Sequence, residues 1–240
     1  MSATAATIWH DVECGAYDAD LPLWEELAAR GDGPVLELGC GTGRVALHLA
    51  RRGHTVVGLD RDPELLAELA SRGDGLPLST VEADARAFEV GEPVSLVLAP
   101  THLLQLLPDA AQRRESLESI AAALRPGGLL AAAIIESMPE ADGAPPPLPD
   151  VREVDGWVYS SLAIEAAVAP GEIVVRRLRQ LVSPEGSLSE EPNEVRIATF
   201  TAEALEEEAT TCGLVPAGRR EIPPTSMHEG SLVVLLERPV

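Results

Sequence analysis

Lysine is absent from this sequence. All 18 basic residues are arginine, against 39 aspartates and glutamates, so the formal net charge is −21. A protein this acidic repels phosphate backbones, and its densest basic cluster, Arg176–Arg179, is small. We therefore expect no nucleic-acid partner, whereas cationic ligands are favoured. A biased genome or a salty cytoplasm would also account for the charge.

Long apolar runs are absent too. No stretch of 18 apolar residues suggests a transmembrane helix, and the first nine residues have neither the basic region nor the apolar core of a secretory signal. The three cysteines, Cys14, Cys40 and Cys212, are odd in number and lack metal-ligand spacing. These absences predict a cytoplasmic protein with no membrane association and no metal.

The composition that is present is typical of a globular protein, with 45% hydrophobic and 24% charged residues. A length of 240 residues fits one large α/β domain, or one domain with an elaboration.

The most informative stretch begins with Val35–Leu38, a short apolar run typical of a buried parallel strand. Three glycines follow at alternate positions, Gly39, Gly41 and Gly43, and an amphipathic helical pattern comes next. The carboxylate of Glu37 within this strand is costly unless something pairs with it. A cationic ligand, or N–H groups of the loop, would be such a partner.

This acid-x-Gly-x-Gly-x-Gly pattern resembles the first motif of the class I S-adenosylmethionine-dependent methyltransferases, whose loop holds the cofactor. The dinucleotide-binding fingerprint is the alternative. Counted from Gly39 it fails at Arg44, but Gly41-x-Gly43-x-x-Ala46 satisfies its looser version. The loop leaves both interpretations open.

Two acids after the next strands favour the methyltransferase interpretation. Asp60 ends a predicted strand over Thr55–Leu59, where both families receive ribose hydroxyls. A third predicted strand, Leu78–Glu82, leads to Asp84, and the resemblance places there the acid that binds the adenine amino group. Dinucleotide-binding proteins have no such requirement.

The segment after a fourth predicted strand, Val94–Ala99, lies where the family places the methyl group and the substrate. It reads Pro100-Thr101-His102 instead of the motif of nucleic-acid amino methyltransferases. His102 is a candidate general base, because imidazole titrates near neutrality; the alternative is a histidine that caps or packs at a strand end.

A Leu-Arg-Pro-Gly-Gly turn then precedes the predicted strand Leu129–Ile135, again as in the family. Glu136 follows this strand and is a second candidate for orienting the substrate. The aromatic residues Trp9 and Tyr17 lie in an N-terminal segment that resembles the lid of small-molecule methyltransferases.

The resemblance implies a fold, four regions and a set of site residues. The fold is a Rossmann-like α/β sheet of seven strands in the order 3-2-1-4-5-7-6. The regions are an N-terminal helical lid segment over 1–33, a cofactor-binding core over 34–136, an insertion over 137–200, and a closing helix and hairpin over 201–240. The expected cofactor residues are Tyr17, Glu37, Gly39, Cys40, Gly41, Thr42, Gly43, Asp60, Arg61 along the adenine, Asp84, Ala85, Pro100 and Thr101. The expected substrate residues are Trp9, His10, His102 and His228, and the catalytic candidates are His102 and Glu136.

Within the insertion, we expect a loop or lid over 139–149 and antiparallel strands over Trp157–Val168, Glu172–Val182 and Glu194–Phe200. Pro170-Gly171 is a natural hairpin turn between the first two strands. The insertion would shape the substrate side or form a homodimer surface.

The expected reaction is direct SN2 transfer of a methyl group from S-adenosylmethionine to a nitrogen or oxygen of a small molecule, leaving S-adenosylhomocysteine. Alignment of the reactants would supply most of the rate. Three alternatives stay open: a nicotinamide-dependent oxidoreductase, a non-catalytic S-adenosylmethionine-binding module, and an insertion that serves only as an interaction surface.

Overall fold

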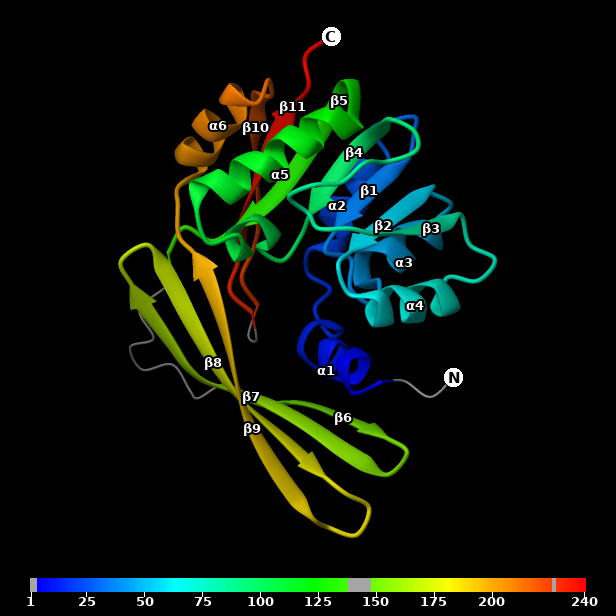
Figure 1. Cartoon of the computed structure of the whole chain (residues 1–240), viewed down its shortest axis with the longest axis vertical. Coiled ribbons are helices and arrows are strands. Elements are labelled where there is room, and N and C mark those ends of the chain that lie inside the picture. Colours follow the sequence, from blue (N-terminus) through cyan, green and yellow to red (C-terminus); the bar gives the residue numbers. More distant parts are fainter. Residues whose placement is uncertain (1–3, 138–147, 226–227) are drawn as a thin grey trace.

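A central sheet with helices on both faces and a second, antiparallel sheet below it make up the chain (Figure 1). This computed structural model describes residues 4–137, 148–225 and 228–240. The helices are α1 (Ala5–Cys14), α2 (Leu21–Ala28), α3 (Arg44–Ala50), α4 (Pro63–Arg72), α5 (Ala110–Ala123) and α6 (Ala202–Thr211), with a short 3-10 helix η1 (Leu103–Leu106). The strands of the central sheet are β1 (Val35–Leu38), β2 (Val56–Asp60), β3 (Leu78–Glu82), β4 (Val94–Ala99), β5 (Leu124–Ile134), β10 (Val215–Ile222) and β11 (Ser231–Glu237). The second sheet contains β6 (Asp150–Val154), β7 (Trp157–Ala169), β8 (Glu172–Val182) and β9 (Leu188–Ala198).

The predicted order of the central sheet is confirmed. Its strands run β3-β2-β1-β4-β5-β11-β10, which is 3-2-1-4-5-7-6 when the insertion is left out. Strand β1 pairs in parallel with both β2 and β4, whereas β11 is antiparallel to β5 and to β10. The strand order diverges on either side of β1, and the carboxyl ends of the parallel strands β1, β2, β3 and β4 meet at one edge. In open α/β sheets, this is where ligands bind.

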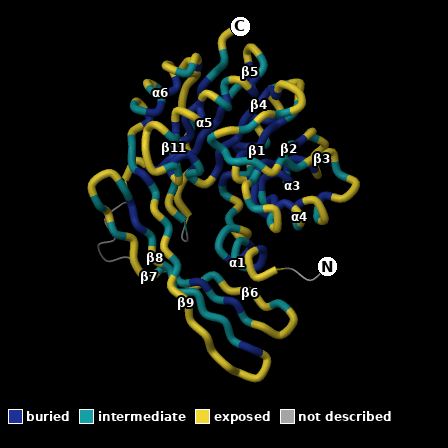
Figure 2. The backbone as a smooth tube through the Cα atoms, in the orientation of Figure 1, coloured by how far each residue is buried: buried dark blue, intermediate teal, exposed yellow. Residues whose placement is uncertain are grey.

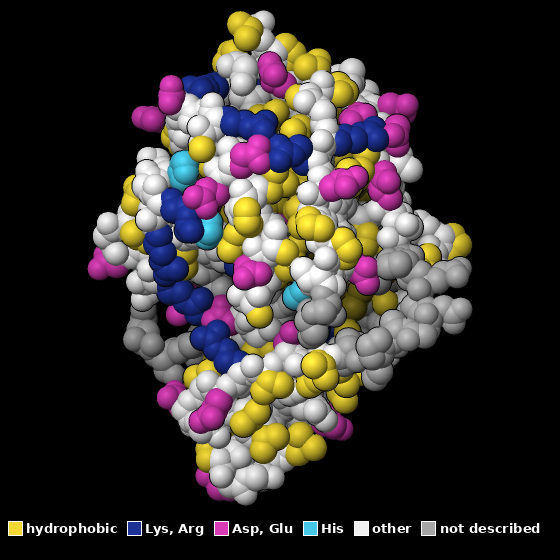
Figure 3. Space-filling view, turned by 180° about the vertical axis from the view of Figure 1, so that it is seen from behind, with side chains coloured by type: hydrophobic (Ala, Val, Ile, Leu, Met, Phe, Trp, Pro, Cys, Tyr) yellow, Lys and Arg dark blue, Asp and Glu magenta, His cyan; other side chains and the backbone are white. Residues whose placement is uncertain are grey.

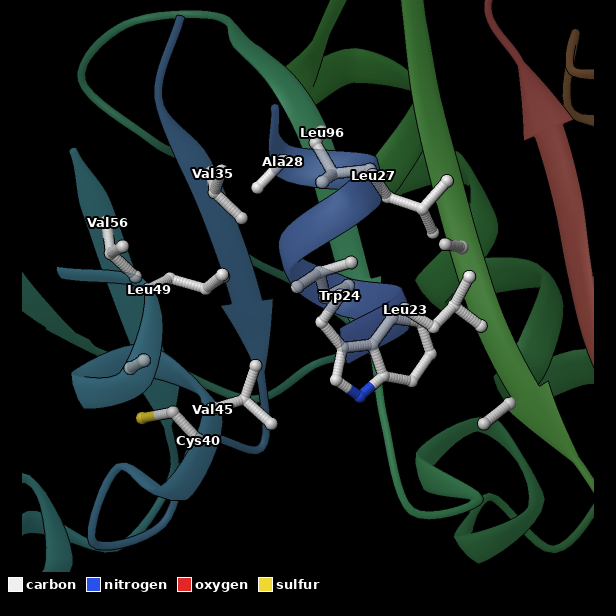
Figure 4. Close-up of a cluster of buried hydrophobic side chains, with 14 of the residues drawn as sticks. Leu23, Trp24, Leu27, Ala28, Val35, Cys40, Val45, Leu49, Val56 and Leu96 are labelled. Carbon is white, nitrogen blue, oxygen red and sulfur yellow. The ribbon is translucent and has the colours of Figure 1, made fainter. Parts of the chain in front are cut away.

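Alternate side chains of the central strands face two separate cores. On one face, α2, α3 and α4 cover the sheet, and Trp24 of α2 is fully buried among Leu23, Val45 and Leu49 (Figure 4). On the other face, α5, α6 and η1 cover the sheet. The central strands are correspondingly dark blue in Figure 2. With both faces covered, a parallel sheet reads as continuous apolar runs, which is why these strands were predictable.

Helix α1 was not predicted, because residues 1–19 show no clear apolar period. Its buried face is half polar: Ile8 and Val12 alternate with Thr7 and Asp11. The available signal was the cap, since the Thr4 hydroxyl accepts a hydrogen bond from the backbone N–H of Thr7 at 3.3 Å.

The second sheet contains one strand more than predicted and a longer last strand. β6 was missed, and β9 begins at Leu188 and ends at Ala198, whereas the predicted strand covered Glu194–Phe200. Acidic residues and Pro192 hid the start of β9, but β9 is an edge strand, which is where sheets tolerate a proline. The predicted turn at Pro170-Gly171 is confirmed, with Gly171 at φ +84°. Most of the lid predicted over 139–149 falls outside the described residues.

The buried side chain of Gln105 helps to join the second sheet to the core. Gln105 of η1 donates from Nε2 to the carbonyl oxygens of Ile135 (2.9 Å) and Ala198 (2.7 Å), and its Oε1 accepts from the Ile135 N–H (2.7 Å). These bonds tie together the two points at which the chain leaves and re-enters the core.

Replacing Gln105 by leucine should therefore lower the free energy of unfolding by at least about 3 kcal/mol, because three buried backbone groups lose their partner. Urea denaturation of Gln105→Leu measures this. The control is Gln180→Leu, whose side chain bonds Glu190 at the protein surface and should change stability by no more than about 0.5 kcal/mol. A loss below about 1 kcal/mol in Gln105→Leu would show that the junction is held by other contacts.

Candidate functional site

The glycine loop after β1 brings bare backbone against neighbouring side chains. Gly39 and Gly41 have φ of +63° and +53°, a conformation that glycine adopts without strain. A Cβ atom on Gly41 would lie 2.1 Å from His10 Nε2, and one on Gly39 would lie 2.6 Å from Leu103 Cδ1. Only glycine fits at either position.

A cavity of about 590 Å³ opens beside this loop, at the carboxyl ends of β1, β2, β3 and β4. Ten of the predicted site residues line it. They are His10, Glu37, Gly39, Cys40, Asp60, Arg61, Asp84, Ala85, Pro100 and Thr101. Sequence reasoning missed the apolar part of its wall, to which Leu65 of α4 and Leu103, Leu106 and Leu107 contribute. These leucines read as ordinary helix and loop residues, and only the fold directs them to the cavity.

Glu37 is the most unusual group in the cavity wall. Its side chain is 3% exposed, and within the described residues Oε2 has no hydrogen-bond partner. Burial raises the pKa of this carboxyl to about 8, although the nearby Arg44 guanidinium and the Ala46 N–H partly oppose the shift. Arg44 itself is engaged by Asp20, at 2.5 and 2.8 Å. Glu37 is therefore a protonated acid at neutral pH that would ionise if a cationic group reached it.

Asp60, at the end of β2, is held in place by backbone groups. Its Oδ2 accepts from the Gly41 N–H at 2.9 Å, and its Oδ1 accepts from the Asp62 N–H at 3.0 Å. Each carboxylate oxygen has two acceptor positions, so each keeps one for a ligand. The arrangement suits a ligand with two adjacent hydroxyl groups. Asp62 begins α4 as its N-cap, and its carboxylate accepts from the Glu64 N–H at 2.9 Å.

Asp84 is engaged by a neighbour that the sequence did not reveal as its partner. Arg86 donates to it from Nε (2.9 Å), from Nη2 (2.6 Å) and from its backbone N–H (2.9 Å). These hydrogen bonds lower the pKa of Asp84 to about 2. Only one of these three hydrogen bonds is made to Oδ2, so Oδ2 can still accept a hydrogen bond from the amino group of a ligand.

His102 does not line the cavity. Thr101 and His102 both have positive φ, +53° and +63°, and the imidazole Nε2 lies 3.1 Å from the Ser231 hydroxyl of β11. Burial lowers the pKa of His102 to about 4, so the ring is neutral at physiological pH. The structure thus places this candidate base against the closing hairpin.

Glu136 also lies outside the cavity lining. Its carboxylate accepts from the Ala202 N–H at 2.7 Å, at the first turn of α6. The geometry is that of a helix cap, which explains an acid at the end of β5 without a ligand.

The N-terminal aromatic residues also point elsewhere. Trp9 packs edge-on against Tyr159 of β7, with ring centroids 5.1 Å apart. Tyr17 stacks on His228 at 4.7 Å and borders a second cavity of about 380 Å³. Neither Trp9, Tyr17 nor His228 lines the cavity beside the glycine loop.

Thr42 lies against α1, and neither it nor Gly43 lines the cavity. The Thr42 hydroxyl donates to Asp11 Oδ1 at 2.6 Å, and it lies 3.1 Å from His10 Nδ1. Arg72 of α4 and Arg152 of β6 both donate to the same Asp11 carboxylate, each at 2.6 Å. Asp11 thereby joins α1 to the core and to the second sheet, and sequence reasoning missed it.

Among the described residues, no group of three or more histidine, cysteine, aspartate or glutamate side chains is placed to hold a metal ion. Nor does any helix in the described ranges have the length and apolar character needed to cross a membrane.

Comparison with known proteins agrees with this geometry. Residues 35–128 match a family model described as a methyltransferase domain. An uncharacterized methyltransferase of Bacillus subtilis is 30% identical over 124 residues, which are 49% of this chain and 51% of that protein. The chain spans about half the length of the curated relatives it matches.

Solved structures match over the whole chain at lower identity. A sugar N-methyltransferase from a Streptoalloteichus species has a TM-score of 0.75 at 16% identity, covering 100% of this chain and 94% of that one. An amino pentose methyltransferase from Micromonospora echinaspora, involved in calicheamicin biosynthesis, has a TM-score of 0.71 at 19% identity, covering 96% of each chain. At such identities the likeness shows a shared fold.

The buried acid makes stability depend on pH in a specific direction. Glu37 holds its proton up to about pH 8 in the folded protein, but its ordinary pKa is 4.5. The unfolded chain therefore loses that proton first, and stability falls as pH rises from about 4.5 to 8. We expect Glu37→Gln to unfold at least about 4 °C above wild type at pH 8.5, and within about 2 °C of it at pH 5.

Calorimetric melting at the two pH values measures this difference. The control is Glu82→Gln, an exposed glutamate at the end of β3, whose melting temperature should follow wild type at both pH values. Equal curves for Glu37→Gln and wild type at pH 8.5 would mean that Glu37 is ionised in the folded protein.

Proposed function

We propose that this chain is a class I S-adenosylmethionine-dependent methyltransferase, in keeping with the methyltransferase domain matched by residues 35–128. It would transfer a methyl group from S-adenosylmethionine to a nitrogen or oxygen of a small molecule. The cofactor supplies a methyl group on a positively charged sulfur, which is already a good leaving group. The protein's task is then to align the acceptor with that methyl group, and alignment alone contributes roughly 7–11 kcal/mol in favourable cases.

The observation that carries the proposal is the unpartnered Oε2 of Glu37 in the cavity wall. S-adenosylmethionine carries an ammonium group and a sulfonium group. Either charge, brought near Glu37, favours the ionised carboxylate and relieves the cost of its burial. The residues present therefore fit this cofactor.

The remaining acids fit the other parts of the same molecule. Asp60 has one free acceptor position on each oxygen for the ribose hydroxyls. Asp84 keeps one on Oδ2 for the adenine amino group, and Arg61 also borders the cavity. The leucines of η1 and α4 offer the apolar contact that an adenine ring needs.

A dinucleotide fits the loop less well. Its pyrophosphate would approach the N–H groups after Gly41, at the start of α3. In this structure Thr42 and Gly43 are buried there, and the Asp11 carboxylate lies 2.6 Å from the Thr42 hydroxyl. Because both residues are buried, their N–H groups are not open to a pyrophosphate.

An amine is the favoured acceptor. A neutral amine needs no base to attack the methyl group and loses its proton afterwards, whereas a hydroxyl needs a base within reach. His102, the base expected from sequence, faces Ser231 instead of the cavity. The net charge of −21 also favours the approach of a protonated amine, which gives up one proton to solvent before it attacks. The two similar structures named above act, by their descriptions, on amino sugars or sugar nitrogen.

Isothermal calorimetry against S-adenosylmethionine, S-adenosylhomocysteine and NAD tests the cofactor. Wild type should bind the first two. Asp60→Asn should bind them at least about tenfold more weakly, because hydrogen bonds to a charged group are lost.

The control for this experiment is Asp74→Asn, in the loop after α4 and outside the cavity lining, which should bind like wild type. Binding of NAD alone would contradict the proposal. Binding of S-adenosylmethionine without methyl transfer to any amine or hydroxyl acceptor in a broad screen would indicate a non-catalytic binding module.

A further inference from the structure

The hydroxyl of Thr42 connects two side chains of α1. It donates its only hydrogen to Asp11 Oδ1, at 2.6 Å, and its oxygen lies 3.1 Å from His10 Nδ1. The direction of the second hydrogen bond depends on the protonation state of Asp11.

Asp11 is an ionised carboxylate. Arg72 donates to it twice, at 3.0 and 2.6 Å, and Arg152 donates once, at 2.6 Å. Although burial opposes the shift, hydrogen bonds from Arg72 and Thr42 hold the pKa of Asp11 below its ordinary value. A carboxylate only accepts hydrogen bonds, so the Thr42 hydrogen is committed to it.

The tautomer of His10 follows. With its hydrogen committed, the Thr42 oxygen can only accept, so Nδ1 of His10 must be the donor. A neutral imidazole with its proton on Nδ1 has a lone pair on Nε2. Among the described residues, no group donates a hydrogen bond to Nε2. The imidazole makes one hydrogen bond there, between Nδ1 and the Thr42 hydroxyl.

The surroundings keep the ring neutral. Burial lowers the pKa of His10. The charged groups nearby are Asp11 and Glu13 of α1, Asp60 of β2 and Arg72 of α4; the carboxylates oppose the shift and Arg72 supports it. Arg152 of β6 acts on the ring through Asp11.

The free nitrogen lies at the loop that holds the ligand. A Cβ on Gly41 would be 2.1 Å from Nε2, and the Gly41 N–H donates to Asp60 Oδ2. His10 and Asp60 both line the cavity. Two acceptors, one neutral and one anionic, therefore flank the same glycine.

We propose that His10 Nε2 accepts a hydrogen bond from the bound nucleoside cofactor, next to Asp60, and that the Asp11–Thr42 pair holds the imidazole in the tautomer that permits it. The proposal rests on the function proposed above, because it takes the ligand to be a nucleoside with a hydroxyl donor. His10 contacts the cofactor, whereas Thr42 and Asp11 are positioning residues. Through Arg152, the second sheet helps to set the cofactor site.

Binding of S-adenosylhomocysteine, measured by calorimetry between pH 5 and 7.5, tests this proposal. His10→Phe keeps a ring of similar size but has no acceptor, and should bind about three- to tenfold more weakly at pH 7.5. A protonated imidazole cannot accept. As the pH is lowered and the imidazole takes up its proton, wild-type affinity should therefore fall relative to that of His10→Phe, so the two affinities converge.

His54→Phe is the matched control. His54 lies outside the cavity, just before β2, and the variant should follow wild type at every pH. A spectrum of the protein with 15N-labelled histidine reports the tautomer directly. We expect His10 to carry its proton on Nδ1 in wild type, and to lose that preference in Thr42→Val.

The outcomes separate this inference from the proposed function. If wild type binds S-adenosylhomocysteine but His10→Phe binds equally well at every pH, or if His10 carries its proton on Nε2, the inference is overturned and the function stands. If wild type does not bind S-adenosylhomocysteine, both fail. Reduced affinity in His10→Phe together with the Nδ1–H tautomer supports the inference, even if Thr42→Val fails to fold.

Discussion

The burial of one carboxyl group constrains the rest of the site. Glu37 lies on the central strand β1, where the sheet order diverges, and its Oε2 has no partner among the described residues. With a pKa raised to about 8, it is an acid kept neutral by its surroundings. Such a group costs stability in the free protein, and a cation offsets that cost. Asp60 and Asp84 lie along the same edge, so one molecule with a cationic end and a nucleoside end would contact all three acids.

A second constraint comes from the way α1 is held. Asp11 accepts hydrogen bonds from the glycine loop, from α4 and from the second sheet. Glu13, on the same helix, accepts from Arg179 of β8 at 2.7 and 2.8 Å. The helix therefore lies between the core and the second sheet and covers the loop beside the cavity (Figure 1). Side chains of arginine form a line down the back of the molecule, with carboxylates beside them (Figure 3). Many of the arginines in this acidic chain form salt bridges with carboxylates. Their positive charge is therefore compensated, and the line of arginines is not by itself a binding site for an anion.

The sheet and most of the cavity wall could be predicted from sequence, because buried parallel strands read as apolar runs and their carboxyl ends meet at one edge. That logic placed Glu37, Asp60 and Asp84 together without any knowledge of side-chain contacts. It failed for α1, because the partners that bury Asp11 come from positions far along the chain. It also missed the orientation of His102, since the positive φ that turns this residue toward β11 leaves no local signature in sequence.

The central prediction is that Glu37 is protonated in the free protein and ionised when a cationic cofactor is bound. Titration of S-adenosylmethionine at pH 7 in buffers of different ionisation enthalpy counts the protons released on binding. Wild type should release nearly one proton per protein, because a group with a pKa of about 8 is mostly protonated at pH 7, and Glu37→Gln should release almost none. Tight binding by wild type with no proton release would contradict the account, because Glu37 would then be ionised before the cofactor arrives.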